Sequence, residues 1–255
     1  MRHLPYLPPE LIALIVDHLH GDTAALKACS LVSHTFLPLA QAHIFENIEL
    51  RFRSKGNIQS MRAIFPPDPC GVLSHVRKLS ISYSSLSITP LILDKILDHF
   101  LAFRKIREFQ ADLDTFHFAD RNRASTSRYF SHFQFTLRSL DLMTIDGDPK
   151  DVITFITFFP LLEELSLTFY KALPGVTQDL RVGVLDPNLL IPLRGTLRIR
   201  ATPPDGRFIT ELAKVRVLYH TLEFGGSALL PGTRVSELIV ACAPTLRIIQ
   251  ISHEC

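Results

Sequence analysis

The chain has 255 residues, of which 47% are hydrophobic and 20% charged, so it can bury a core and is not a disordered protein. Its formal net charge of +2 is too small to favour nucleic acid or a membrane surface as a partner. The 4 scattered cysteines form no C-x-x-C pair, and no apolar stretch approaches the roughly 20 residues of a membrane span. We therefore expect a reduced protein of the cytoplasm or nucleus.

The first 50 residues predict three short helices. Pro8 and Pro9 stand where a helix begins, because a missing N–H costs little there. Gly21 suits the position after the first helix, and Asp22 is a plausible N-cap for the second. The second and third predicted helices cover residues 23–29 and 33–45.

The first helix carries more apolar side chains than one small core can take. Its apolar residues are Leu7, Leu11, Ile12, Leu14, Ile15, Val16 and Leu19. Leu14 and Val16 are typical of ordinary core positions. Since the rest cannot all point inward, we expect some to remain available to a partner or to the rest of the chain.

A different sequence pattern begins after a proline-containing linker over residues 51–73. Short stretches of the form apolar-x-x-apolar-x-apolar recur every 25 to 32 residues and predict strands. They cover residues 76–81, 106–111, 137–142, 162–167, 193–199, 218–224 and 246–251. One short strand per unit at this period is the pattern of a solenoid.

Helical patterns precede several of these strands, over residues 91–101, 151–158 and 235–243. The predicted fold class is therefore α/β, with parallel short strands on one face and helices on the other. No polar capping unit follows the last strand pattern. We expect its edge to be exposed, so that either the chain is shorter than its relatives or a partner covers that edge.

The N-terminal pattern resembles a known family. The segment Leu7-Pro8-Pro9-Glu10-Leu11-Ile12, followed later by Leu31-Val32-Ser33, is similar to the F-box, over about residues 5–50. The region over residues 74–252 resembles irregular leucine-rich repeats more loosely. The resemblance implies an F-box-like domain over residues 1–50, a linker over 51–73, and a leucine-rich-repeat-like region over 74–255.

That resemblance also implies partners. F-box proteins bind a Skp-type adaptor and through it a cullin scaffold, while their repeats hold a protein substrate for ubiquitin transfer. The implied adaptor-binding residues are Leu7, Pro8, Leu11, Ile15, Leu19, Leu26, Leu31, Val32 and Phe36. The last four complete either the contact or the small core behind it. Phe36 stands where the family often has Trp, which reduces the apolar area.

No catalytic, phosphate-binding or metal-binding motif is present, so we expect no enzyme activity and no cofactor. His18 and His20 lie two residues apart, on different faces of a helix, and make a poor metal pair. Cys242, at a predicted helix end, is typical of a buried cysteine.

Arginines offer weaker candidates for substrate binding. Arg198 and Arg200 share a strand face and could line the recognition surface, although a solvated face is the alternative. A loop cluster of Arg121, Arg123 and Arg128 could bind phosphate or simply be solvated. Three functions remain open: a ubiquitin-ligase adaptor, an interaction scaffold that causes no degradation, and an enzyme with an unrecognised site.

Overall fold

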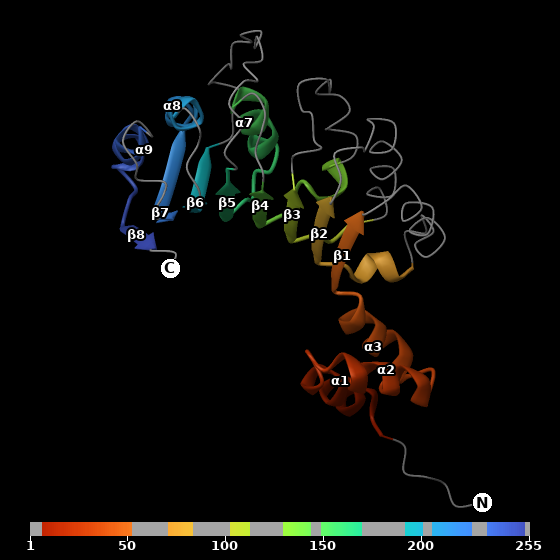
Figure 1. Cartoon of the computed structure of the whole chain (residues 1–255). Helices are drawn as coiled ribbons and strands as arrows, with labels where there is room; N and C mark the ends of the chain where they lie inside the picture. The colour runs from red at the N-terminus through yellow and green to blue at the C-terminus, as the bar shows by residue number, and fades with distance from the viewer. Residues whose placement is uncertain are drawn as a thin grey trace, which may run out of the picture.

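The computed structural model describes residues 7–52, 71–83, 103–112, 130–143, 149–169, 192–200, 206–225 and 234–252. Within these ranges the chain is an α/β protein with six α-helices, two short 3₁₀ helices and one eight-stranded parallel sheet (Figure 1). The predicted helix over residues 91–101 and the Arg121 cluster lie outside the described residues. No described helix has the length and apolar character needed to cross a membrane.

Three helices form the N-terminal segment, as the sequence predicts. They are α1 (Pro9–His18), α2 (Thr23–Val32) and α3 (Phe36–Ile44). Asp22 caps α2, because its carboxylate accepts hydrogen bonds from the backbone N–H groups of Ala24 and Ala25 at 3.1 and 3.0 Å. Gly21 has φ +95°, the left-handed region that glycine tolerates after a helix.

The three helices enclose a small core. Its buried residues are Ile12, Val16, Leu26 and Ala40. Partly buried side chains pack around it: Leu19, Cys29, Phe36, Leu39 and Ile44. So few buried residues give limited hydrophobic stabilisation, which is typical of a piece of this size.

The sheet follows the chain strictly in order. Its strands are β1 (Asn47–Phe52), β2 (Lys78–Tyr83), β3 (Glu108–Asp112), β4 (Ser139–Met143), β5 (Glu164–Thr168), β6 (Leu193–Ile199), β7 (Val217–Gly225) and β8 (Ile248–Ser252). All seven neighbouring pairs are parallel. Figure 1 shows the strands in one row, with α7 (Pro149–Thr157), α8 (Arg207–Lys214) and α9 (Val235–Cys242) on one side of it.

The register confirms the predicted spacing of the strands. The middle apolar residue of each strand pattern pairs with its counterpart in the next strand, so these residues form one row across the sheet. The row is Ile48, Leu79, Phe109, Leu140, Leu165, Leu197, Leu222 and Ile249. All but Ile249 are buried, so one apolar row runs through the core between the sheet and the helices.

One strand and one α-helix of the structure are not predicted by the sequence. In strand β1 the alternate residues Ile48 and Leu50 point into the core. The strand directly follows the helical region, and no turn signal in the sequence separates the two. Helix α8 begins directly after Gly206, the last residue of the predicted turn, which has a φ of +68°. Phe208, Ile209 and Leu212 then face the core at helical spacing.

The helical segment joins the sheet directly. Only Phe45 and Glu46 separate α3 from β1. The backbone carbonyl of Glu46 accepts hydrogen bonds from the N–H groups of Arg77 and Lys78 at 2.8 and 3.0 Å. These bonds extend the β1–β2 pairing back to the end of the helices.

Strand β8 forms one edge of the sheet. Its side chains are exposed, including those of Ile248, Ile249 and Ile251, each about half exposed. The expected exposure of this last strand is therefore confirmed for the residues that the structure describes.

Candidate functional site

An exposed apolar stripe runs along α1. Leu11, Leu14 and Ile15 are 47, 58 and 43% exposed, and Leu7, just before the helix, is 46% exposed. Residues three and four apart share a helix face, so these side chains point together away from the core that Ile12 and Val16 fill. We call Leu7, Leu11, Leu14 and Ile15 the α1 stripe.

The end of α2 carries a second exposed apolar pair. Leu31 and Val32 are 87 and 68% exposed. A leucine this exposed forgoes nearly all of its burial free energy, about 1.5–3 kcal/mol. We call these two residues the α2 tip. Both surfaces are of the kind that proteins cover with a partner.

The structure separates the nine residues of the expected adaptor contact into three groups. Six are exposed: Leu7, Pro8, Leu11, Ile15, Leu31 and Val32. Leu19 and Phe36 are partly buried against the helical core, and Leu26 lies inside it at 2% exposure. The expectation that Leu14 is a core residue is wrong, because its side chain belongs to the α1 stripe, whereas Val16 is fully buried.

The second candidate surface is the sheet face opposite the apolar row. Arg198 and Arg200 both lie on it, on the same side of β6, but each is ion-paired. Arg198 contacts Glu223 at 2.6 Å and Glu164 at 3.2 Å, and Arg200 lies 3.6 Å from Asp141. The hydrogen bond that Arg198 Nε donates to Glu223 Oε2 is the main cause that raises the pKa of Arg198 above its ordinary value.

The middle of this face also carries polar atoms without partners. Asp141 Oδ1 and Ser166 Oγ are buried and lack a hydrogen bond to any described group. Nearby, Ser80 donates to Gln110 at 3.2 Å. A buried polar atom without a partner costs free energy, so these two atoms make the sheet less stable than fully hydrogen-bonded atoms would.

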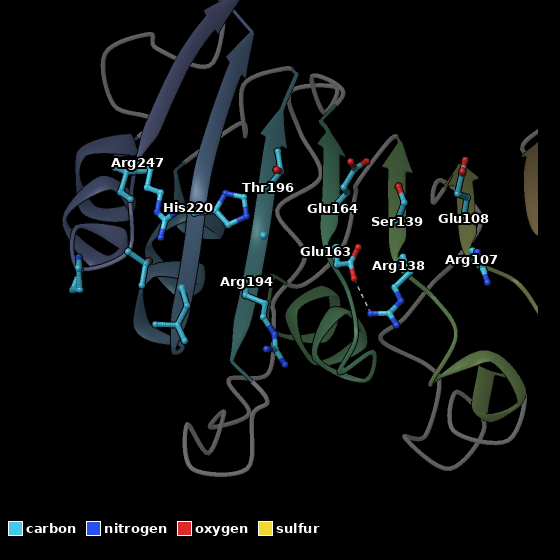
Figure 2. Close-up of a pocket in the computed structure, with 15 residues that line it drawn as sticks. Arg107, Glu108, Arg138, Ser139, Glu163, Glu164, Arg194, Thr196, His220 and Arg247 are labelled. Atoms are coloured by element: carbon cyan, nitrogen blue, oxygen red, sulfur yellow. Dashed lines mark hydrogen bonds and ion pairs between the residues drawn. The ribbon is translucent and has the colours of Figure 1, made fainter.

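A hollow of about 1090 Å³ lies beside the starts of the strands (Figure 2). Four arginines line it: Arg107, Arg138, Arg194 and Arg247. Three glutamates also line it: Glu108, Glu163 and Glu164. We call this the arginine hollow.

The charges of the hollow do not cancel. Each glutamate already has a cationic partner, with Lys78–Glu108 at 2.9 Å, Arg138–Glu163 at 2.7 Å and Arg198–Glu164 at 3.2 Å. Within the described part of the chain, Arg107, Arg194 and Arg247 make no ion pair. The hollow therefore suits an anionic group, which guanidinium groups can bind through paired hydrogen bonds.

The sequence did contain a signal for this hollow. Arg77, Arg107, Arg138 and Arg247 each stand two residues before the middle apolar residue of their strand. Because the strands are parallel and in register, such residues gather along one edge of the sheet. Arg194 enters the hollow from one position earlier, at the irregular start of β6.

No family model matches the chain, and no curated protein matches its sequence.

Proposed function

We propose that the chain is a substrate-recognition adaptor of a Skp-cullin-F-box ubiquitin ligase, working in the cytoplasm or nucleus. In this proposal α1–α3 are an F-box that binds a Skp-type adaptor, and the sheet is a leucine-rich-repeat-like solenoid that binds a protein substrate. The observation that carries the proposal is the exposed α1 stripe with the exposed α2 tip.

The energetics favour a partner on these helices. The helical core holds few residues, while six large apolar side chains of the same segment stand in solvent. The four side chains of the α1 stripe are already about half buried, so covering the rest of each is worth roughly 1 kcal/mol before the costs of association. The i, i+3, i+4 spacing on α1 suits insertion of a helix face into an apolar groove.

The sheet supports the second half of the proposal. A single row of parallel strands presents a broad polar face rather than a deep enclosed pocket, which favours a protein segment over a small molecule. The arginine hollow would take an acidic part of that segment. The chain itself then needs no catalytic group, because holding a substrate near a transfer site raises its effective concentration.

The test is a titration calorimetry experiment with the full chain and a purified Skp-type adaptor. We expect the double variant Leu11→Glu/Ile15→Glu to bind at least about 100-fold more weakly than the native chain, because two buried apolar contacts would become buried charges. Val240→Glu is the matched control, since Val240 is 73% exposed on α9 and lies outside the α1 stripe and α2 tip. Equal binding by all three proteins would contradict the proposal.

Ligase function has a separate test. The half-lives of proteins captured by the chain are compared in cells with the native chain and with Leu11→Glu/Ile15→Glu. Faster turnover with the native chain supports a ligase adaptor. Unchanged turnover despite adaptor binding would replace the proposal by a scaffold that recruits partners without degradation.

A further inference from the structure

Three potential metal ligands meet where the helices join the sheet. His20 follows the end of α1, His43 lies in the last turn of α3, and Glu46 stands just before β1. One ligand atom from each lies within 4.8 Å of the others. His43 and Glu46 are three residues apart in the sequence, whereas His20 lies 23 residues before His43, so only the folded chain brings His20 to the other two.

The spacing of these atoms fits a zinc-class ion. His20 Nδ1 lies 3.3 Å from His43 Nδ1 and 3.6 Å from Glu46 Oε2. Two nitrogen ligands held about 2.0–2.1 Å from a tetrahedral zinc ion are about 3.3–3.4 Å apart. The two imidazoles therefore already have the separation that such an ion requires.

A carboxylate orients the second histidine. His43 Nε2 lies 2.8 Å from Asp17 Oδ1, so this nitrogen carries the proton and donates to the carboxylate. The lone pair of Nδ1 then faces His20. Metal-binding histidines generally have such an outer carboxylate or carbonyl, which fixes the tautomer and ring orientation.

The glutamate is also held in place. Its backbone carbonyl accepts the hydrogen bonds from Arg77 and Lys78, and its Oε1 lies 3.8 Å from Arg77 Nε. This leaves Oε2 as the oxygen nearest to His20. The side chains of His43 and Glu46 are 21 and 26% exposed, whereas that of His20 is 59% exposed and free to adjust.

We propose that His20, His43 and Glu46 bind one zinc-class divalent ion, with Asp17 orienting His43 and water completing a tetrahedral site. The ion would link the ends of α1 and α3 to the start of β1. It would thereby fix the helical segment on the sheet and set the direction in which the α1 stripe faces. This role is independent of which partner binds the helices.

The test is a titration of the untagged full chain with Zn²⁺ by calorimetry and with Co²⁺ by visible absorption, which reports tetrahedral coordination. We expect one ion per chain. His43→Ala and His20→Ala should each weaken binding at least about tenfold and remove the tetrahedral Co²⁺ bands. Asp17→Asn should weaken binding about 10- to 100-fold, because it removes the outer carboxylate.

His18→Ala is the matched control, because His18 is exposed on α1 and lies outside the cluster. It should bind Zn²⁺ like the native chain. Circular dichroism checks that each variant is folded. The proposal is overturned if His43→Ala and His20→Ala bind Zn²⁺ as tightly as His18→Ala does, or if the native chain binds no Zn²⁺ at millimolar concentration.

Discussion

Leu26 and Leu31 lie on the same helix, but they have opposite environments. Leu26 is 2% exposed in the helical core, and Leu31 is 87% exposed at the α2 tip. The sequence placed both among the candidate contacts and could not divide contact from core, because both are apolar residues of one short helix. Only the packing of α2 against α1 and α3 separates them.

The two leucines should respond differently to truncation. We expect Leu26→Ala to lower the free energy of unfolding by about 2–4 kcal/mol, because it leaves a cavity. Leu31→Ala should change it by less than about 0.5 kcal/mol but weaken binding of the Skp-type adaptor. Urea denaturation and adaptor titration measure both effects. Equal destabilisation by the two variants would be inconsistent with this division.

Cys242 offers a test of burial on the other side of the molecule. It is fully buried in α9, and burial raises the pKa of its thiol to about 11. At pH 8 it therefore holds roughly 200-fold less thiolate than an ordinary cysteine with a pKa of about 8.5. Native-state labelling with iodoacetamide, mapped by mass spectrometry, should leave Cys242 unmodified until urea unfolds the chain.

The same shift has a defined effect on stability. The pKa of Cys242 is higher in the folded chain than in the unfolded chain. The stabilisation of the folded state by the neutral thiol is therefore complete below about pH 8.5, and it is lost as the pH rises toward 11. Rapid labelling of Cys242 in the folded chain would contradict its placement in the core.

At the scale of elements, β6 depends on one glycine. The register with β7 shifts between Gly195 and Thr196, and Gly195 has φ +95°. A Cβ at Gly195 would lie in direct collision with the carbonyl of Glu163 in the neighbouring segment. Gly21 has the same φ of +95°, but a Cβ there would meet nothing within 4 Å.

These two glycines form a matched pair of substitutions. Gly21→Ala should cost only the strain of the positive φ, about 1–2 kcal/mol. Gly195→Ala should cost roughly 3 kcal/mol or more, because the strand must also move away from Glu163. Thermal and urea unfolding compare the two variants. A similar loss of stability in both would show that the close approach at Gly195 is unimportant.

Most elements could be predicted because their apolar residues follow one period. The row through Leu79, Leu140 and Leu165 is visible in the sequence, and parallel pairing in register follows from it. Helices α7 and α9 could be predicted because helical patterns precede the strands that follow them. Strand β1 and helix α8 are not predicted because each lies where the preceding segment indicates another structure.

The candidate site was less predictable than the fold. The shared face of Arg198 and Arg200 follows from strand alternation, but their glutamate and aspartate partners lie on other strands. Likewise, His43 and Glu46 meet His20 only because α3 packs beside the end of α1. Contacts between distant segments depend on packing, which a single sequence does not specify.

For the whole molecule, the two candidate surfaces lie on different parts of the chain. The α1 stripe belongs to the helical segment before β1, whereas the arginine hollow lies along strands β3 to β8 (Figures 1 and 2). A partner on the helices would therefore leave the hollow open. This arrangement allows one chain to hold two partners at once.

The hollow should bind an acidic peptide. We expect a hexaglutamate peptide to bind in a salt-dependent manner, because the attraction is electrostatic. The double variant Arg107→Gln/Arg194→Gln should weaken this binding at least about tenfold. Arg216→Gln is the control, since Arg216 is exposed but does not line the hollow. Fluorescence anisotropy measures the affinities, and equal loss in the double variant and the control would contradict a specific site.

The most direct test of the central proposal is hydrogen–deuterium exchange of the full chain with and without a purified Skp-type adaptor. We predict that the adaptor slows exchange in α1 and at the end of α2 and leaves strands β3 to β7 unchanged. Slower exchange confined to the sheet, or no change anywhere, would contradict docking through the α1 stripe and the α2 tip.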